Sequence, residues 1–244
     1  MILPTEVAAA LDELAAHLRD TERVDALWVA GSLATGDYVP GVSDLDLVAL
    51  TDGPLDPEVV ATIHLALDAG VAAGLDLGCQ YADRGRLEDL DVLHPTWTHG
   101  QLVDRVVSLV TRVELARHGF AVVGPPPGDV LPAETRYQAV AAGQRELLGY
   151  WSWAARHPGL FCRHPVMVDL GLTAMARARH SIWRGELLTK SEAIEQAHAP
   201  VWLKEQMRAR RQGSDVRSPR WRAAYVAWRD VRRTTASTTE GVAD

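Results

Sequence analysis

Two aspartates two residues apart in an apolar run are the first sign of chemistry in this sequence. The run reads Asp44-Leu-Asp-Leu-Val-Ala-Leu50. In a β-strand, residues i and i+2 project from one face, so Asp44 and Asp46 lie together while the leucine after each of them turns into the core. Two carboxylates held together repel each other unless a cation lies between them. Such oxygen ligands suit Mg²⁺, which takes its remaining ligands from water and substrate phosphates.

A glycine-serine turn precedes this strand. Gly31-Ser32 follows the apolar run Ala26-Leu-Trp-Val-Ala30, which we predict to be a strand. Gly31 lets the backbone approach a ligand closely, and Ser32 with its neighbouring N–H groups can hold phosphate oxygens at the start of a short helix. Either feature alone is well explained by an ordinary turn and an exposed strand face. Their combination predicts a site for Mg²⁺ and a nucleotide.

The string Gly31-Ser-Leu-Ala-Thr-Gly-Asp-Tyr38, followed by Ser43-Asp-Leu-Asp-Leu47, resembles the signature of the DNA polymerase β-type nucleotidyltransferases. More narrowly, it resembles that of the streptomycin/spectinomycin adenylyltransferases. The resemblance implies an α+β fold, with an N-terminal nucleotidyltransferase domain (a small mixed sheet flanked by helices) and a C-terminal α-helical bundle. It also implies transfer of AMP from ATP, with one or two Mg²⁺, to a hydroxyl of an aminoglycoside antibiotic and release of pyrophosphate.

The same resemblance implies roles for particular residues. In the N-terminal domain it assigns Gly31, Ser32 and Ser43 to the nucleotide and Asp44 and Asp46 to the metal. Relatives carry a third acid, usually Glu, on the neighbouring strand, where it faces the acceptor hydroxyl. Asp76 takes this place here and would ligate metal or accept the hydroxyl proton. Because Asp is one methylene shorter than Glu, Asp83 remains the alternative, as does a plain exposed acid on an edge strand.

In the helical domain, the segment Arg184–Ala193 resembles a family segment in which a glycine-containing turn precedes a lysine at a helix start. Thr189 and Glu192 predict a capping box that places Lys190 at the first helical position. Arg177 stands where relatives carry an arginine that faces the nucleotide. The resemblance therefore implies that ATP contacts residues of both domains, although each cation could instead be a solvated surface residue.

Two residues are candidates for binding the acceptor. By resemblance, Trp97 offers an aromatic face and Asp169 a carboxylate to the ammonium or guanidino groups of a small cationic molecule. A buried tryptophan and a surface aspartate are the alternatives. Two other functions also remain open: transfer to a protein or metabolite, as in the nucleotidyltransferases of toxin–antitoxin pairs, and nucleotide-fold binding without catalysis.

Composition narrows the class of protein. The chain has 244 residues, a net charge of −7 and a pI near 5.7, which argues against a general nucleic-acid binder. It carries no signal-peptide pattern and no apolar run long enough to span a bilayer, so we expect a cytoplasmic protein and no membrane partner. Its two cysteines, Cys79 and Cys162, indicate neither a disulfide framework nor a thiolate metal site. We expect a monomer.

Periodicity places the elements around these residues. We predict helices over 5–19, capped by Thr5, over 57–70 and over 99–118, and strands over 74–81 and 120–123. The run Gly124-Pro-Pro-Pro-Gly128 stops both helix and sheet, which predicts a domain boundary. Beyond it we predict helices over 134–153, 165–183, 191–197 and 220–233. The predicted domains are therefore 1–128 and 129–233, followed by a disordered polar tail over 234–244.

Overall fold

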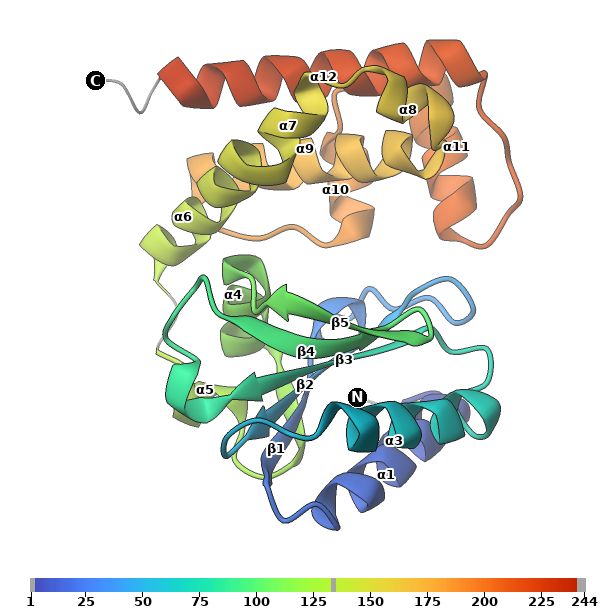
Figure 1. The fold of residues 1–244 in the computed structure, drawn as a ribbon. Coiled ribbons are helices and arrows are strands. Elements are labelled where there is room, and N and C mark those ends of the chain that lie inside the picture. The colour runs from blue at the N-terminus through green and yellow to red at the C-terminus, as the bar shows by residue number, and fades with distance from the viewer. Residues whose placement is uncertain (1–2, 133–134, 241–244) are drawn as a thin grey trace. The chain divides into compact units, whose positions relative to one another are not determined.

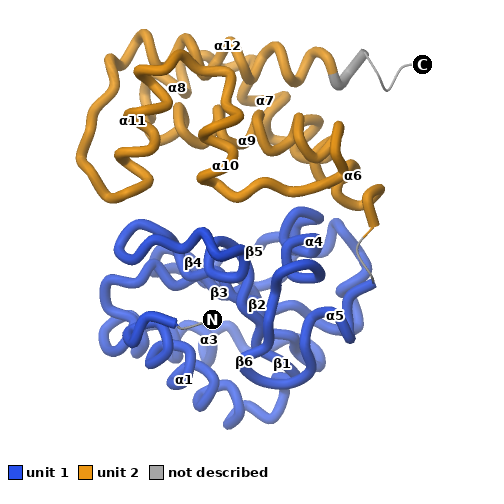
Figure 2. The backbone as a smooth tube through the Cα atoms, turned by 180° about the vertical axis from the view of Figure 1, so that it is seen from behind, with its two compact units in different colours: residues 1–134 blue, residues 135–244 orange. Residues whose placement is uncertain are grey.

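The computed structural model describes residues 3–132 and 135–240, and the chain divides into two compact units, residues 1–134 and 135–244 (Figures 1 and 2). The first unit is a mixed sheet with helices and the second is helical, so the predicted α+β fold is confirmed. The sequence placed the boundary earlier, after Gly128. That proline-rich segment instead packs on the first unit: the indole N–H of Trp28 donates to the carbonyl of Pro125 at 2.8 Å, and Leu131 is buried in the same cluster as Trp28.

Six strands form the sheet of the first unit, in the order β5-β4-β3-β2-β1-β6. The strands are β1 Val24–Val29, β2 Leu45–Thr51, β3 Leu77–Asp83, β4 Leu93–Thr98, β5 Gln101–Val106 and β6 Phe120–Val123. Strands β2 and β3 run parallel, and the other neighbouring pairs are antiparallel. The starts of β2 and β3 therefore meet at one edge of the sheet.

Helices cover both faces of this sheet (Figure 1). They are α1 Thr5–Arg19, α2 Gly31–Ala34, α3 Pro57–Ala69, α4 Leu109–His118 and α5 Pro127–Val130, with a short 3₁₀ turn over Arg84–Arg86. One cluster joins α1 and α3 to the face that carries Leu45 and Leu47, and another joins Leu115 of α4 to Trp28 on the opposite face. Burial on both faces explains why the strands read as nearly continuous apolar runs. The predicted cap of α1 is wrong, because Pro4 holds the N-cap position and no side chain caps the helix.

The predicted helix over residues 99–118 is wrong in its first half. That part is β5, which pairs with β4 through a two-residue hairpin turn, and α4 starts only at Leu109. His99 and Gly100 form the turn with φ of 49° and 72°, the backbone that a tight hairpin of this kind requires. β5 is an edge strand with polar residues on it, so its sequence lacks the apolar alternation of the inner strands.

The second unit is a bundle of helices. They are α6 Arg136–Glu146, a π-helical turn Leu147–Trp151, α7 Ser152–Ala155, α8 Gly159–Arg163, α9 Val166–Arg184, α10 Lys190–Gln196, α11 Val201–Arg211 and α12 Arg220–Glu240. Glu134, where the predicted helix over 134–153 begins, lies outside the described residues. Within the part of the chain that the structure describes, no helix combines the length and the apolar character needed to cross a bilayer.

The last helix, α12, continues through residues that the sequence assigned to a disordered tail. Thr234 and Thr235 are buried in it. The hydroxyl of Thr235 donates to the carbonyl of Val231 at 2.9 Å, and that of Thr234 accepts from Arg179 Nη1 at 2.7 Å. These contacts satisfy the polar side chains inside the helix, which composition alone could not indicate. Residues 241–244 lie outside the described residues.

His64 of α3 is a buried titratable group in the core of the first unit. Its ring is 0% exposed, its Nε2 lies 2.7 Å from the hydroxyl of Tyr81, and it stacks on Trp97 with centroids 5.2 Å apart. Burial lowers the pKa of His64 to about 4. Between about pH 4 and pH 6.5, the imidazole of His64 is therefore neutral in the folded protein and protonated in the unfolded chain.

This shift predicts that stability falls in mild acid. Between the unfolded pKa of about 6.5 and the folded value, the unfolded chain binds a proton that the folded chain does not, so the free energy of unfolding decreases as pH drops, by up to roughly 3 kcal/mol. Urea unfolding at about pH 7.5 and about pH 5 measures the difference. His64→Gln, which keeps a partner for Tyr81, should show a smaller loss. If the free energy of unfolding falls equally in the wild type and in His64→Gln, His64 is not the cause of the pH dependence.

Candidate active site

The two aspartates lie at the N-terminal end of β2. Asp46 is the second residue of the strand and is exposed, whereas Asp44 precedes the strand and is half-buried. Leu45 and Leu47 are 0% and 3% exposed and belong to the core. The predicted alternation is therefore confirmed within the strand, where Leu45 and Leu47 are buried and Asp46 between them is exposed. That Asp44 shares the face of Asp46 stays a prediction from strand geometry.

Gly31 contacts the carboxylate of Asp46. The glycine opens α2 directly after β1, with a φ of +57°, and a Cβ added there would lie 2.0 Å from Asp46 Oδ2. The backbone is joined at the same point, because the N–H of Ala30 donates to the carbonyl of Asp46 at 2.9 Å. The glycine-serine turn and the aspartate strand, which the sequence predicted to act together, are thus adjacent.

Ser32 is mostly buried in the single turn of α2. Its carbonyl accepts the N–H of Asp37 at 2.8 Å, which folds the following loop back on the turn. A helix of four residues has little cumulative dipole. A phosphate bound here would depend on the Ser32 hydroxyl and nearby N–H groups rather than on a long helix.

Ser43 and Tyr38 organise the loop before Asp44. The hydroxyl of Ser43 accepts the N–H of Val39 at 3.0 Å and is buried, so it closes the loop that leads into β2. Burial raises the pKa of Tyr38, and the negative charges of Glu6 and Asp44 raise it further. The Tyr38 phenol therefore lies within electrostatic range of Asp44.

The parallel pairing of β2 and β3 brings a third acid to this edge. Leu45 pairs with Leu77, and the N–H of Leu45 donates to the carbonyl of Asp76 at 2.9 Å. Asp44 and Asp76 each precede the paired leucines, so both stand where the two strands start. The sequence predicted Asp76 inside a strand over 74–81. In the structure, Asp76 lies just before β3 instead.

The sheet topology argues against Asp83 as the third acid of the site. Asp83 pairs with Thr51 at the C-terminal ends of the parallel strands, the opposite end from Asp44 and Asp46. Its carboxylate is also engaged locally, because Oδ1 accepts the N–H of Gly85 at 2.9 Å as the cap of a 3₁₀ turn.

His99 is a site residue that the sequence did not reveal. Its Nδ1 lies 2.9 Å from Asp76 Oδ2, and the β4–β5 hairpin turn holds it there. The two residues line a cavity of about 320 Å³ together with Asp68, whose carboxylate accepts the indole N–H of Trp97 at 3.1 Å. The dipeptide His99-Gly100 was the available signal, since both residues tolerate positive φ, but the helix assignment concealed it.

The two acceptor candidates have other partners. Trp97 is 2% exposed, so its ring offers no face to an acceptor in this structure, and its contact with this region is the hydrogen bond to Asp68. We therefore correct its assignment as an acceptor platform. Asp169 is paired by both oxygens with Arg210, at 2.7 Å to Nε and 2.7 Å to Nη2. A cationic acceptor would have to compete with that guanidinium.

The structure gives the local surroundings of the two nucleotide candidates of the helical unit. The capping box of α10 is confirmed, with Thr189 Oγ1 accepting the N–H of Glu192 at 3.1 Å and Glu192 Oε2 accepting that of Thr189 at 2.9 Å. Lys190 is the exposed first residue of the helix. Arg177 Nε donates to the carbonyl of Leu188 at 2.8 Å, which holds the segment before α10 against α9.

The carboxylates of the first unit fit a metal that arrives with its substrate. Among the described residues, no three His, Cys, Asp or Glu side chains gather closely enough to hold a metal ion by themselves. Asp44 and Asp46 supply two carboxylates on one strand face, and Mg²⁺ bound to a nucleotide needs no more than one or two from the protein. The donor set therefore fits Mg²⁺ with bound phosphate and does not fit a preformed cage.

Comparison with known proteins agrees with this geometry. Residues 11–98, which run from the middle of α1 to the end of β4 and include both aspartates, match the nucleotidyltransferase domain family. Among solved structures, the chain is similar to the spectinomycin adenyltransferase AAD(9) from Enterococcus faecialis, crystallised with ATP and spectinomycin. The TM-score is 0.65 at 11% sequence identity, over 95% of this chain and 99% of that one. No protein of curated function matches the sequence. The chain thus contains a nucleotidyltransferase domain over residues 11–98 and shares the fold of AAD(9), which supports an enzyme that transfers nucleotides.

Proposed function

We propose that the protein is an ATP-dependent adenylyltransferase whose acceptor is a hydroxyl of an aminoglycoside. The observation that carries the proposal is the contact of Gly31 with Asp46, at the edge of the sheet where Asp44 precedes β2 and Asp76 precedes its parallel neighbour β3. The turn that we propose for phosphate binding, Gly31-Ser32, therefore lies beside carboxylates that would suit a metal–nucleotide complex. The fold similarity to an enzyme crystallised with ATP and spectinomycin supports the choice of nucleotide and acceptor.

The proposed reaction is an in-line transfer at the α-phosphorus of ATP. The acceptor oxygen forms a bond to that phosphorus, the bond to the bridging oxygen breaks, and pyrophosphate leaves. Asp44 and Asp46 would hold Mg²⁺, which would neutralise charge on the leaving group. Asp76 accepts the proton of the attacking hydroxyl, and His99 orients its carboxylate through the contact at 2.9 Å.

The nucleotide is proposed to use four further residues. Ser32 donates its hydroxyl to a phosphate oxygen, and Ser43 fixes the loop from which Asp44 emerges. Lys190 supplies an ammonium beside the first N–H groups of α10. Arg177 is proposed to face the nucleotide, and its hydrogen bond to the carbonyl of Leu188 also holds the segment before α10 in place.

The acceptor is proposed to enter the small cavity beside Asp76. Asp68 and Asp76 line it, so it presents carboxylates to the ammonium or guanidino groups of an aminoglycoside. Trp97 contributes by holding Asp68. Asp169 takes part only if the acceptor displaces Arg210 from it.

An assay of pyrophosphate release from Mg-ATP over a panel of aminoglycosides tests this function. We expect release that depends on the acceptor, and a gain of one AMP in the mass of at least one antibiotic; streptomycin and spectinomycin are the first to try. Binding at the carboxylates should weaken with added salt, because screening at 1 M extends over only about 3 Å. If ATP binds but no aminoglycoside is adenylylated, the acceptor is a protein or a metabolite.

A further inference from the structure

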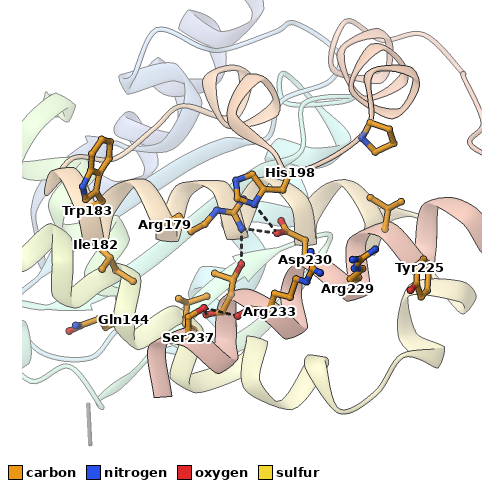
Figure 3. Close-up of a pocket in the computed structure, with 14 residues that line it drawn as sticks. Gln144, Arg179, Ile182, Trp183, His198, Tyr225, Arg229, Asp230, Arg233 and Ser237 are labelled. Carbon is orange, nitrogen blue, oxygen red and sulfur yellow. Dashed lines mark hydrogen bonds and ion pairs between the residues drawn. The ribbon is translucent and has the colours of Figure 1, made fainter. Parts of the chain in front are cut away.

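A second cavity, of about 800 Å³, is lined entirely by residues of the helical unit (Figure 3). Its walls come from α6, the π-helical turn after it, α9, α12 and the segment before α11. This volume lies in the range of pockets that bind small organic molecules.

The cavity lies on a different face of α9 from the residue proposed for the nucleotide. Arg179, Ile182 and Trp183 line it, and residues spaced by three and four share one helix face. Arg177 is two positions from Arg179, which is about 200° around the helix. It points to the segment before α10, where it binds Leu188. The cavity therefore belongs to a separate part of the unit.

A buried ion pair forms one wall of this cavity. Asp230 is 5% exposed, and its Oδ1 lies 2.8 Å from Arg179 Nη1 and 3.5 Å from Nδ1 of the exposed His198 (Figure 3). Asp230 Oδ2 and Arg179 Nη2 are buried without a hydrogen-bond partner among the described residues. Buried charged groups usually have their polar atoms paired, so the wall offers one further acceptor and one further donor.

Two further arginines and two aromatic residues also line the cavity. Arg229 and Arg233, four residues apart on α12, are exposed and line the cavity with Arg179, whereas Asp230 is the one acid among the lining residues. Trp183 and Tyr225 are 68% and 56% exposed and lie toward opposite ends of the cavity in Figure 3. Guanidinium groups pair well with phosphate and carboxylate, and exposed aromatic rings stack with planar ones.

We propose that this cavity binds a small organic anion with a planar ring, at a site separate from the residues assigned to nucleotidyl transfer. Arg229 and Arg233 hold its phosphate or carboxylate. A polar group on the ligand meets the Arg179–Asp230 pair, which keeps His198 and Arg179 in position. The site goes beyond the proposed reaction and does not depend on it.

Calorimetric titration without divalent metal tests the site. The probes are AMP, 4-hydroxybenzoate and adenosine, which offer a ring with a phosphate, a ring with a carboxylate and a ring without charge. We expect at least one of the two anions to bind, and adenosine to bind far more weakly. Arg233→Gln should weaken the anion about tenfold, the effect of losing one charge-assisted hydrogen bond.

Arg232→Gln is the matched control, since Arg232 is an exposed arginine of the same helix that lies over the ring of Trp228 instead of lining the cavity. Its affinity for the anion should equal that of the wild type. The site is disproved if neither anion binds, if adenosine binds as tightly as AMP, or if Arg233→Gln and Arg232→Gln behave alike. Because no turnover is measured, failure here leaves the proposed reaction untouched.

Discussion

Asp46→Asn is expected to abolish nucleotidyl transfer while the protein stays folded. Asparagine keeps the shape of the side chain beside Gly31 but removes the charge that would hold Mg²⁺. The rate should fall by about three orders of magnitude or more, roughly 4 kcal/mol in the barrier. Asp44→Asn should behave in the same way. Pyrophosphate release at saturating Mg²⁺ measures the rate, and circular dichroism reports folding.

Loss of charge also predicts a stability effect that distinguishes a binding role from a structural one. Asp44 and Asp46 share a strand face, so removing one charge relieves repulsion, and the melting temperature without Mg²⁺ should stay the same or rise slightly. Asp83→Asn is the matched control, because Asp83 stands at the other end of β3 and caps a local turn. It should retain activity. Retained turnover in Asp46→Asn would disprove the proposed metal site.

The sequence could predict what depends on local pattern. The leucine–aspartate alternation of β2 and the capping box before Lys190 involve residues within a few positions of one another, and the structure confirms both geometries. The sequence predicted that Gly31 and Asp46 belong to one site because of a motif, not because of periodicity. The physical basis of their adjacency, the close approach of a carboxylate to a residue without a side chain, is visible only in three dimensions.

What the sequence missed depends on contacts between distant segments. His99 reaches Asp76 across the sheet through an edge hairpin whose polar strand has no periodic signal. The polar residues after Arg233 continue α12, and Arg179, more than fifty positions earlier, donates a hydrogen bond to Thr234 there. Both segments have partners far away in the sequence, which composition and local periodicity do not reveal.

Gly31→Ala is expected to inactivate the enzyme more than it destabilises it. The new Cβ would lie 2.0 Å from Asp46 Oδ2 and 2.8 Å from Asp46 Cγ, so the carboxylate must move. A displacement of that size at the proposed metal ligand should cost at least about a hundredfold in rate. The φ of +57° adds strain for alanine, on the order of 1–2 kcal/mol of stability.

Gly36→Ala separates the two effects. Gly36 also has a positive φ, +75°, but a Cβ there meets nothing within 4 Å. It should lose a similar free energy of unfolding, measured in urea, and keep its activity. If Gly36→Ala and Gly31→Ala lose activity in proportion to their stability, backbone strain alone explains the loss. If Gly31→Ala alone loses activity, the contact with Asp46 is what makes a glycine necessary, because the turn must leave the carboxylate room to hold a metal.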